Sequence, residues 1–312
     1  MSRPRQPGLG RAPLPDAPPA ATMPQAPILD RMPRTRSSQA VPIANHRPRP
    51  PGPLLLLLEG RAPLEYFSML AAYPWLRRLP RGDGHPVMVF PGLGANDATT
   101  WPLRGFLRRL GYVTQAWGQG FNAGPRVGVL DRCAADIREL ADRTGQRVSL
   151  LGWSLGGIYA REMAKEHPEL TRSVITLGTP FTGHPRDTNA WRVYEWLTAT
   201  RVGDPEMMAR TRIAPPVPTT SIFSRSDGIV AWRCSLNEPG PLAENIEVPA
   251  SHVGMGMNPT ALYAIADRLA QPSGQWKPFE VSGVRRLFFR TTGHDPGTGG
   301  RPATHRVTGG PA

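Results

Sequence analysis

The sequence is poor in cysteine and lacks a long hydrophobic run, and both shortages exclude classes of protein. Its 312 residues include two cysteines, Cys133 and Cys234, which are too few for a disulfide framework and are not spaced as metal ligands. The apolar run Leu54 to Leu58 is only five residues long, whereas a membrane-spanning helix needs about 20. We therefore expect no metal site and no transmembrane segment.

A secretory signal is also missing from the start of the sequence. Residues 1–52 are rich in Pro, Arg and Ala, and their prolines rule out the apolar helix that such a signal requires. These residues bury too little apolar surface to offset the entropy lost on ordering, which predicts a disordered tail. In the absence of a targeting segment, the expected location is cytoplasmic.

The excess positive charge lies mainly in the two ends of the chain. The net charge is +13, but residues 1–52 hold eight arginines against two acidic residues, and residues 271–312 hold six basic residues against two acidic ones. The simplest interpretation is two solvated tails, with 271–312 largely disordered and no required nucleic-acid partner. The alternative is that the basic tails contact a nucleic acid or an anionic surface.

Between the tails, apolar runs alternate with amphipathic stretches. Residues 53–84 predict a helical lead-in broken at Pro63, and residues 85–270 predict one α/β domain. The predicted strands are 87–90, 113–118, 148–154, 173–180, 219–224 and 245–248, and the predicted helices are 101–112, 126–145, 155–167 and 259–270. This alternation predicts a mostly parallel central sheet flanked by helices. Residues 181–218 interrupt it as an insertion with helical character around 189–200.

A glycine-rich segment, Gly152 to Gly157, carries the strongest chemical signal. It reads G-W-S-L-G-G, follows an apolar strand and precedes a helix. In that setting G-x-S-x-G marks a tight strand-to-helix turn that exposes a serine hydroxyl over the edge of a sheet. The N-terminus of the following helix favours negative charge there. Ser154 is therefore the predicted nucleophile.

A serine nucleophile needs a base, and the base needs a carboxylate to orient it. The histidines after Ser154 are His167, His184, His252, His294 and His305. His252 stands out, because it follows the strand at 245–248 in a loop of small residues. Asp227 follows the strand at 219–224 and completes the order Ser, Asp, His. Asp187 and Asp204 are the alternatives for the acid, one strand earlier.

Two backbone amides are needed to stabilise an oxyanion. Leu155, directly after the nucleophile, supplies one of them. Leu93 supplies the other, from the loop Pro91-Gly92-Leu93-Gly94 that follows the first predicted strand. Trp153, next to the nucleophile, is expected to contact the substrate.

These motifs, together with Leu177-Gly178-Thr179-Pro180, resemble the α/β-hydrolase superfamily in its lipase and esterase branches. The L-G-T-P segment is similar to the corresponding segment of bacterial triacylglycerol lipases and their lecithin-acyltransferase-like relatives. The Gly152 to Gly157 turn is similar to the one around the nucleophile of carrier-protein methyl esterases. The resemblance covers about 85–270. It implies a serine hydrolase that needs no cofactor, with 181–218 as a lid or cap. Pro91 departs from the pattern, because many members have His there.

The resemblance leaves more than one function open. The main prediction is a lipase or carboxylesterase that cleaves a small-molecule or lipid acyl ester through an acyl-serine intermediate. An acyltransferase would use the same residues and differ only in excluding water. A non-catalytic binding protein on the same fold is the third possibility, because fold alone does not imply activity.

Overall fold

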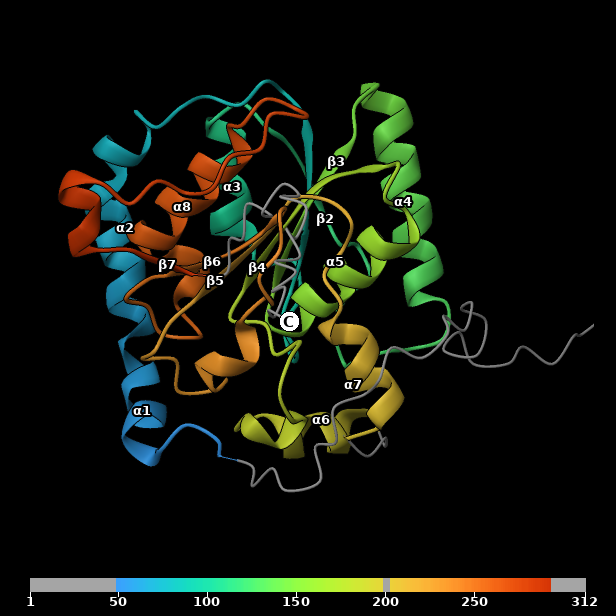
Figure 1. Ribbon diagram of the computed structural model, residues 1–312, viewed down its shortest axis with the longest axis vertical. Helices are drawn as coiled ribbons and strands as arrows, with labels where there is room; N and C mark the ends of the chain where they lie inside the picture. The colour runs from blue at the N-terminus through green and yellow to red at the C-terminus, as the bar shows by residue number, and fades with distance from the viewer. Residues whose placement is uncertain (1–48, 199–202, 293–312) are drawn as a thin grey trace, which may run out of the picture. The chain divides into compact units, whose positions relative to one another are not determined.

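The computed structural model describes residues 49–198 and 203–292, so the disorder predicted for residues 1–48 and 293–312 lies outside the described residues. The described chain forms a seven-stranded sheet in the order β2-β1-β3-β4-β5-β6-β7 (Figure 1). Strands β1 to β6 pair in parallel, and β7 pairs antiparallel with β6. The strands are β1 (Pro86–Phe90), β2 (Val113–Ala116), β3 (Val148–Trp153), β4 (Thr171–Leu177), β5 (Thr219–Phe223), β6 (Ala243–Glu247) and β7 (Arg290–Thr292). The predicted α/β class with a mostly parallel sheet is confirmed.

Helices cover both faces of the sheet, which explains why the central strands are apolar throughout. On β1, Val87 and Val89 join the core under α2, α3 and α8, whereas Met88 and Phe90 join the core under α4 and α5. Figure 1 shows these two groups of helices on opposite sides of the sheet. The helices are α2 (Ala62–Leu76), α3 (Trp101–Arg109), α4 (Val129–Thr144), α5 (Leu155–Glu166) and α8 (Pro259–Leu269).

The strand order has a topological switch point beside β1. The chain leaves β1 to form β2 on one side and then returns to form β3 on the other side of β1. Connections that diverge in this way leave a gap beyond the strand ends, where open α/β sheets bind ligands. The loop after β1 and the turn after β3 both border this point.

The lead-in folds as α1 (Pro53–Leu58), a 3-10 turn (η2, Glu59–Arg61) and α2. The break is therefore at Glu59–Arg61 rather than at Pro63. Pro63 lies in the first turn of α2, where a helix does not use the N–H that proline lacks. Helix α2 packs against α8 and so joins the main core.

The C-terminal boundary predicted at residue 270 is too early. Residues 271–292 lie on the domain, with a 3-10 turn (η6, Gly283–Leu287) followed by β7 at the sheet edge. Phe279 and Phe289 are buried, and their rings pack edge to face with the ring centroids 5.0 Å apart. The prediction of a largely disordered tail is therefore wrong for 271–292, because two separated phenylalanines and an edge strand secure a segment of otherwise polar composition.

The insertion between β4 and β5 contains a 3-10 turn (η3, Pro185–Asp187), α6 (Trp191–Thr198) and α7 (Pro205–Arg212). The helical character expected around 189–200 corresponds to α6. Trp196 is 80% exposed and α6 has no fully buried residue. Within the described ranges, no helix combines the length and the hydropathy needed to cross a bilayer.

Candidate active site

Ser154 occupies the sharp turn between β3 and α5. Its backbone lies at φ 52° and ψ −123°, and it is the one non-glycine residue of the described chain with positive φ. Its amide donates to the Leu177 carbonyl at 2.8 Å, which fixes the turn against β4. A Cβ on Gly152 would overlap Gly157, and one on Gly156 would overlap the Phe90 carbonyl. The flanking glycines are therefore required by close approach of the backbone, and strain of this kind clusters at functional sites.

Asp227 and His252 meet beyond the carboxyl ends of β5 and β6. His252 Nδ1 lies 2.7 Å from Asp227 Oδ2, and both side chains are buried. The other oxygen of Asp227 accepts the amides of Ile229 at 2.8 Å and Val230 at 2.7 Å. Because an ionised carboxylate only accepts hydrogen bonds, Nδ1 carries the proton and Nε2 is the basic nitrogen. The alternative acids are engaged elsewhere, with Asp187 accepting the Arg49 amide and Asp204 capping α7.

The end of β4 lies between Ser154 and the Asp227–His252 pair. Gly178 follows the residue that binds the Ser154 amide, and a Cβ on Gly178 would lie 2.9 Å from His252 Nδ1 and 3.0 Å from Asp227 Oδ2. On the other side, the indole N–H of Trp153 donates to the His252 carbonyl at 3.0 Å. Ser154, Asp227 and His252 thus lie at the carboxyl edge of the same sheet, and a direct contact joins Asp227 to His252. Their joint action as a triad stays a prediction.

The environment of His252 acts on its pKa in two directions. Burial lowers this pKa, whereas the charge of Asp227, the hydrogen bond that His252 donates to Asp227 and the charge of Glu59 raise it, and the net shift is upward. The charged imidazole is therefore stabilised at the place where a general base would hold a proton.

The Trp153 side chain is buried in the hydrophobic core, whereas a residue that contacts substrate is expected to border an open site. Trp153 is only 8% exposed and belongs to the core under α2 and α8. A Cβ on Gly256 would contact its ring. These contacts show Trp153 packed against the segment that carries His252, and its contact with substrate stays a prediction.

The loop after β1 lies against Ser154. A Cβ on Gly92 would lie 3.2 Å from Ser154 Cβ and 3.9 Å from Ser154 Oγ. The Ala95 amide donates to the Gly92 carbonyl at 3.2 Å, which closes a turn around Leu93 and Gly94, and Gly94 has φ +71°. This placement brings the Leu93 backbone into the neighbourhood of the serine, beside Leu155 at the start of α5. Their role as oxyanion donors stays a prediction.

Asn122 was not found from the sequence, although it fixes this loop. Its side-chain amide donates to the Pro91 carbonyl at 2.8 Å, its backbone amide donates to Ala95 at 2.8 Å, and its carbonyl accepts the Gly94 amide at 2.8 Å. The side chain is fully buried. A lone asparagine in a loop between glycines gives no signal that distinguishes this role from an ordinary turn.

A hydrogen-bonded series of Asp, His and Ser side chains lies at the amino edge of the sheet, opposite the edge that holds Ser154. His85 Nδ1 lies 2.6 Å from Asp83 Oδ1, and its Nε2 lies 2.9 Å from Ser149 Oγ. Ser149 is near the amino end of β3, roughly 16 Å along an extended strand from Ser154. Both Ser149 and His85 are buried, and burial lowers the pKa of His85. The Asp83, His85 and Ser149 series has the residue types of a catalytic triad, but its serine hydroxyl is not accessible. Ser149 is therefore a matched control for Ser154.

Neither cysteine is suited to nucleophilic chemistry. Cys133 and Cys234 are free and buried, and burial raises the pKa of each thiol to about 12. A reactive cysteine needs a lowered pKa and exposure. Over 49–198 and 203–292, no cluster of three or more His, Cys, Asp or Glu side chains is arranged to hold a metal ion.

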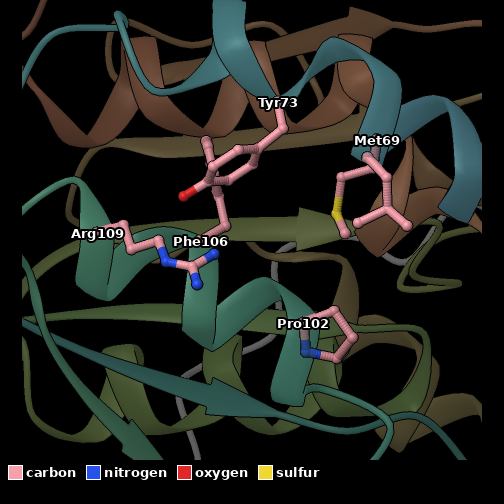
Figure 2. A pocket seen from close by; sticks show the side chains of 6 residues that line it. Met69, Tyr73, Pro102, Phe106 and Arg109 are labelled. Carbon is pink, nitrogen blue, oxygen red and sulfur yellow. The ribbon is translucent and has the colours of Figure 1, made fainter.

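Figure 2 shows a groove between α2 and α3, away from these residues. Its lining is Met69, Leu70, Tyr73, Pro102, Phe106 and Arg109. The Arg109 guanidinium lies 5.1 Å from the Tyr73 ring centroid. No residue of the predicted active site lines this groove, so it is separate from the carboxyl-edge site.

Comparison with known families gives an independent view of the chain. A family model described as the alpha/beta hydrolase family matches residues 87–299, more than half of the sequence. A curated relative, the pimeloyl-[acyl-carrier protein] methyl ester esterase of Aeromonas hydrophila subsp. hydrophila, is 30% identical over 99 residues. These residues are 31% of this chain and 39% of the relative, so the match spans about two fifths of that protein.

Solved structures of similar shape include two lipases. Aspergillus fumigatus lipase B matches with a TM-score of 0.48 and 18% identity, over 63% of this chain and 55% of the lipase. The mature form of Bacillus licheniformis lipase BlEst2 matches with a TM-score of 0.47 and 16% identity, over 62% and 95% of the two chains. The range that the family model matches, residues 87–299, includes the positions of Ser154, Asp227 and His252.

Proposed function

Because this chain belongs to the alpha/beta hydrolase family, we propose that it is a serine hydrolase that cleaves carboxylic esters through an acyl-serine intermediate. The observation that carries the proposal is the strained Ser154 turn beside the 2.7 Å Asp227–His252 pair. The carrier-protein methyl ester esterase is a partial relative, and it supports an ester as the substrate class.

In the proposed reaction, Ser154 Oγ attacks the ester carbonyl while His252 Nε2 takes the hydroxyl proton. Asp227 keeps the proton on Nδ1 and stabilises the imidazolium that forms. The backbone amides of Leu93 and Leu155 donate to the carbonyl oxygen as it becomes negative. Collapse of the tetrahedral intermediate breaks the ester bond, and His252 gives its proton to the departing alcohol.

Water completes the cycle by the same chemistry. His252 removes a proton from the water as it attacks the acyl group on Ser154. The acid is released when the bond to Oγ breaks and His252 returns its proton to Oγ. An alcohol acceptor in place of water would give acyl transfer with the same residues.

The test is covalent labelling with a fluorophosphonate, followed by intact-mass analysis. We expect one adduct on the parent protein, mapped to Ser154, and no adduct on Ser154→Ala, because only an activated serine attacks phosphorus at a useful rate. The labelled parent should lose hydrolysis of p-nitrophenyl esters in proportion to the adduct. Folded parent protein that forms no adduct and cleaves no ester would contradict the proposal.

Asn122→Ala is expected to lower kcat for ester hydrolysis by about tenfold, with a smaller effect on KM. The loss of a whole oxyanion donor costs about 10²–10³ in rate, and Asn122 acts on such a donor only by holding the Pro91–Ala95 loop in place. Steady-state kinetics with a soluble ester gives both parameters.

Asn245→Ala is the matched control, because Asn245 is also a buried amide, and it is bonded to Asn237 in the connection between β5 and β6, away from the loop after β1. That variant should lose thermal stability and keep its kcat. An Asn122 variant that behaves like the Asn245 variant would show that Asn122 has only a structural role.

A further inference from the structure

Two acidic side chains of the lead-in reach into the active-site loops from outside the hydrolase sheet. Glu59 in η2 and Glu65 in α2 are each only 8% exposed. Acidic residues are rarely buried to this degree unless they are paired or hydrogen-bonded. Their hydrogen bonds go to the two loops that carry Asp227 and His252. We refer to residues 224–230 as the acid loop and to residues 249–254 as the histidine loop.

The Glu59 carboxylate bridges these two loops. Its Oε1 accepts the Gly228 amide at 2.7 Å and the His252 amide at 2.9 Å. Its Oε2 accepts the Val253 amide at 2.9 Å. One carboxylate thus binds the residue after Asp227, the proposed base itself and the residue after that base. Hydrogen bonds from backbone amides to an ionised carboxylate are among the stronger ones in proteins.

Glu65 and Arg61 hold the residues on the other side of the same pair. Glu65 accepts the Ser251 amide at 2.7 Å and the Ser251 hydroxyl at 2.9 Å. Arg61 donates to the Ser226 carbonyl at 3.0 Å and to the Ser226 hydroxyl at 2.7 Å, and it lies 3.4 Å from Glu65. The lead-in therefore contacts the residues on both sides of Asp227 and on both sides of His252.

The loops are shaped to accept the lead-in at close range. A Cβ on Gly228 would overlap the carbonyl oxygen of Leu55 in α1, and a Cβ on Gly254 would overlap the Glu65 carboxylate. Neither glycine has the positive φ that would explain its presence by backbone conformation. Close approach of the α1 backbone is therefore the reason that glycine is needed at position 228, whereas a larger residue at position 254 would displace the Glu65 side chain.

We propose that Glu59 and Glu65 are positioning residues of the active site. In this proposal α1, η2 and α2, which are residues 53–76 of the lead-in, form a clamp that fixes the acid loop and the histidine loop against each other. The proposal rests on the proposed function, since it assigns these carboxylates a part in orienting His252 toward Ser154. Neither carboxylate touches the reacting atoms, so their effect on the reaction passes through the backbone of the two loops.

Charge adds to the positioning effect of Glu59. The charged groups around His252 are Asp227 at Nδ1, Glu59 at the backbone amide, Glu65 one residue before it and Arg61 at the acid loop. Burial lowers the pKa of His252, and the charges of Asp227 and Glu59 raise it. Neutralising Glu59 should therefore lower the pKa of His252, so the acid limb of the rate profile should move to lower pH.

The closing experiment compares Glu59→Gln and Glu65→Gln with the parent full-length chain. Glutamine keeps the size of the side chain but removes the charge and one acceptor oxygen. We expect kcat to fall about ten- to a hundredfold in Glu59→Gln with little change in KM, because small displacements of reacting groups carry penalties of this order. The acid limb of kcat/KM should shift downward in pH. Amide hydrogen exchange should be faster in peptides covering Gly228 and 252–253.

Glu244→Gln is the matched control. Glu244 is buried and accepts the Phe279 amide at 2.7 Å and the Thr220 hydroxyl at 2.8 Å, near the amino end of β6. This variant should melt at a lower temperature while kcat and the pH profile stay at the parent values. Glu59 and Glu65 variants that lose only thermal stability, with parent kcat and parent exchange in both loops, would overturn the proposal.

The two proposals fail in different ways. If the parent neither reacts with a fluorophosphonate nor cleaves esters, the proposed function fails. Amide exchange in the two loops still reports in that case whether the carboxylates hold them. If the parent is active and the variants match it in rate and exchange, the clamp fails and the proposed function stands.

Discussion

Ser154→Ala is expected to lower kcat for ester hydrolysis by about a millionfold, the size of loss seen when a serine nucleophile is removed from an intact triad. The hydroxyl is the atom that forms the acyl-enzyme bond, so no neighbouring group replaces it. Residual turnover above the uncatalysed rate should persist, because the Leu93 and Leu155 amides would still polarise the bound ester. The measurement is steady-state hydrolysis of a chromogenic ester, with protein purified free of host esterases.

Ser149→Ala provides the comparison within the same strand. Ser149 contacts a histidine that contacts an aspartate, but it is buried at the amino edge of the sheet. We expect this variant to lose thermal stability, since the His85 and Ser173 hydrogen bonds are broken, and to keep its rate. A loss of rate in Ser149→Ala with parent rate in Ser154→Ala would show that the nucleophile has been assigned to the wrong serine.

The strand-to-helix turn at Ser154 was predictable because its determinants are local. The apolar strand, the glycines and the following helix occupy a short window, and the steric need for Gly152 and Gly156 follows from the turn itself. The pairing of His252 with Asp227 was predictable for a different reason. Each follows a parallel strand, and the carboxyl ends of such strands share one edge.

The contribution of the lead-in was not predictable in this way. Glu59 lies 193 residues from His252 in sequence, and no periodicity relates the two. The one available signal was the single acidic residue that directly follows five leucines, which reads equally well as the solvated end of a helix. The packing of α2 on α8 and on the 3-10 turn η5 (Met255–Met257) brings the lead-in to the histidine loop.

The ordered segment after α8 was missed because its support is also long-range. The Phe279 amide is bonded to Glu244, 35 residues away, and β7 exists only through its pairing with β6. A composition average over 271–312 mixes this segment with the residues beyond 292. A short strand at a sheet edge has little sequence pattern of its own.

Asp227→Asn is expected to lower kcat by about 10⁴-fold, because an amide stabilises the wrong tautomer of the base. Asp227 accepts the Nδ1 proton of His252 and leaves Nε2 free to act on Ser154. An asparagine that donates to Nδ1 would instead place the proton on Nε2. The substitution preserves volume, so the Ile229 and Val230 amides still find an acceptor oxygen.

The pH profile separates this loss from a general loss of structure. Attraction to Asp227 raises the pKa of His252 against the opposing effect of burial. Asp227→Asn removes that attraction, so the acid limb of kcat/KM should move to lower pH while the plateau falls. Asp187→Asn and Asp204→Asn are the decisive controls, since both acids lie in the insertion and neither is the carboxylate at Nδ1. Both should keep the parent plateau and the parent acid limb. A 10⁴-fold loss in either of them, with Asp227→Asn near the parent rate, would move the acid of the triad to the strand before β5.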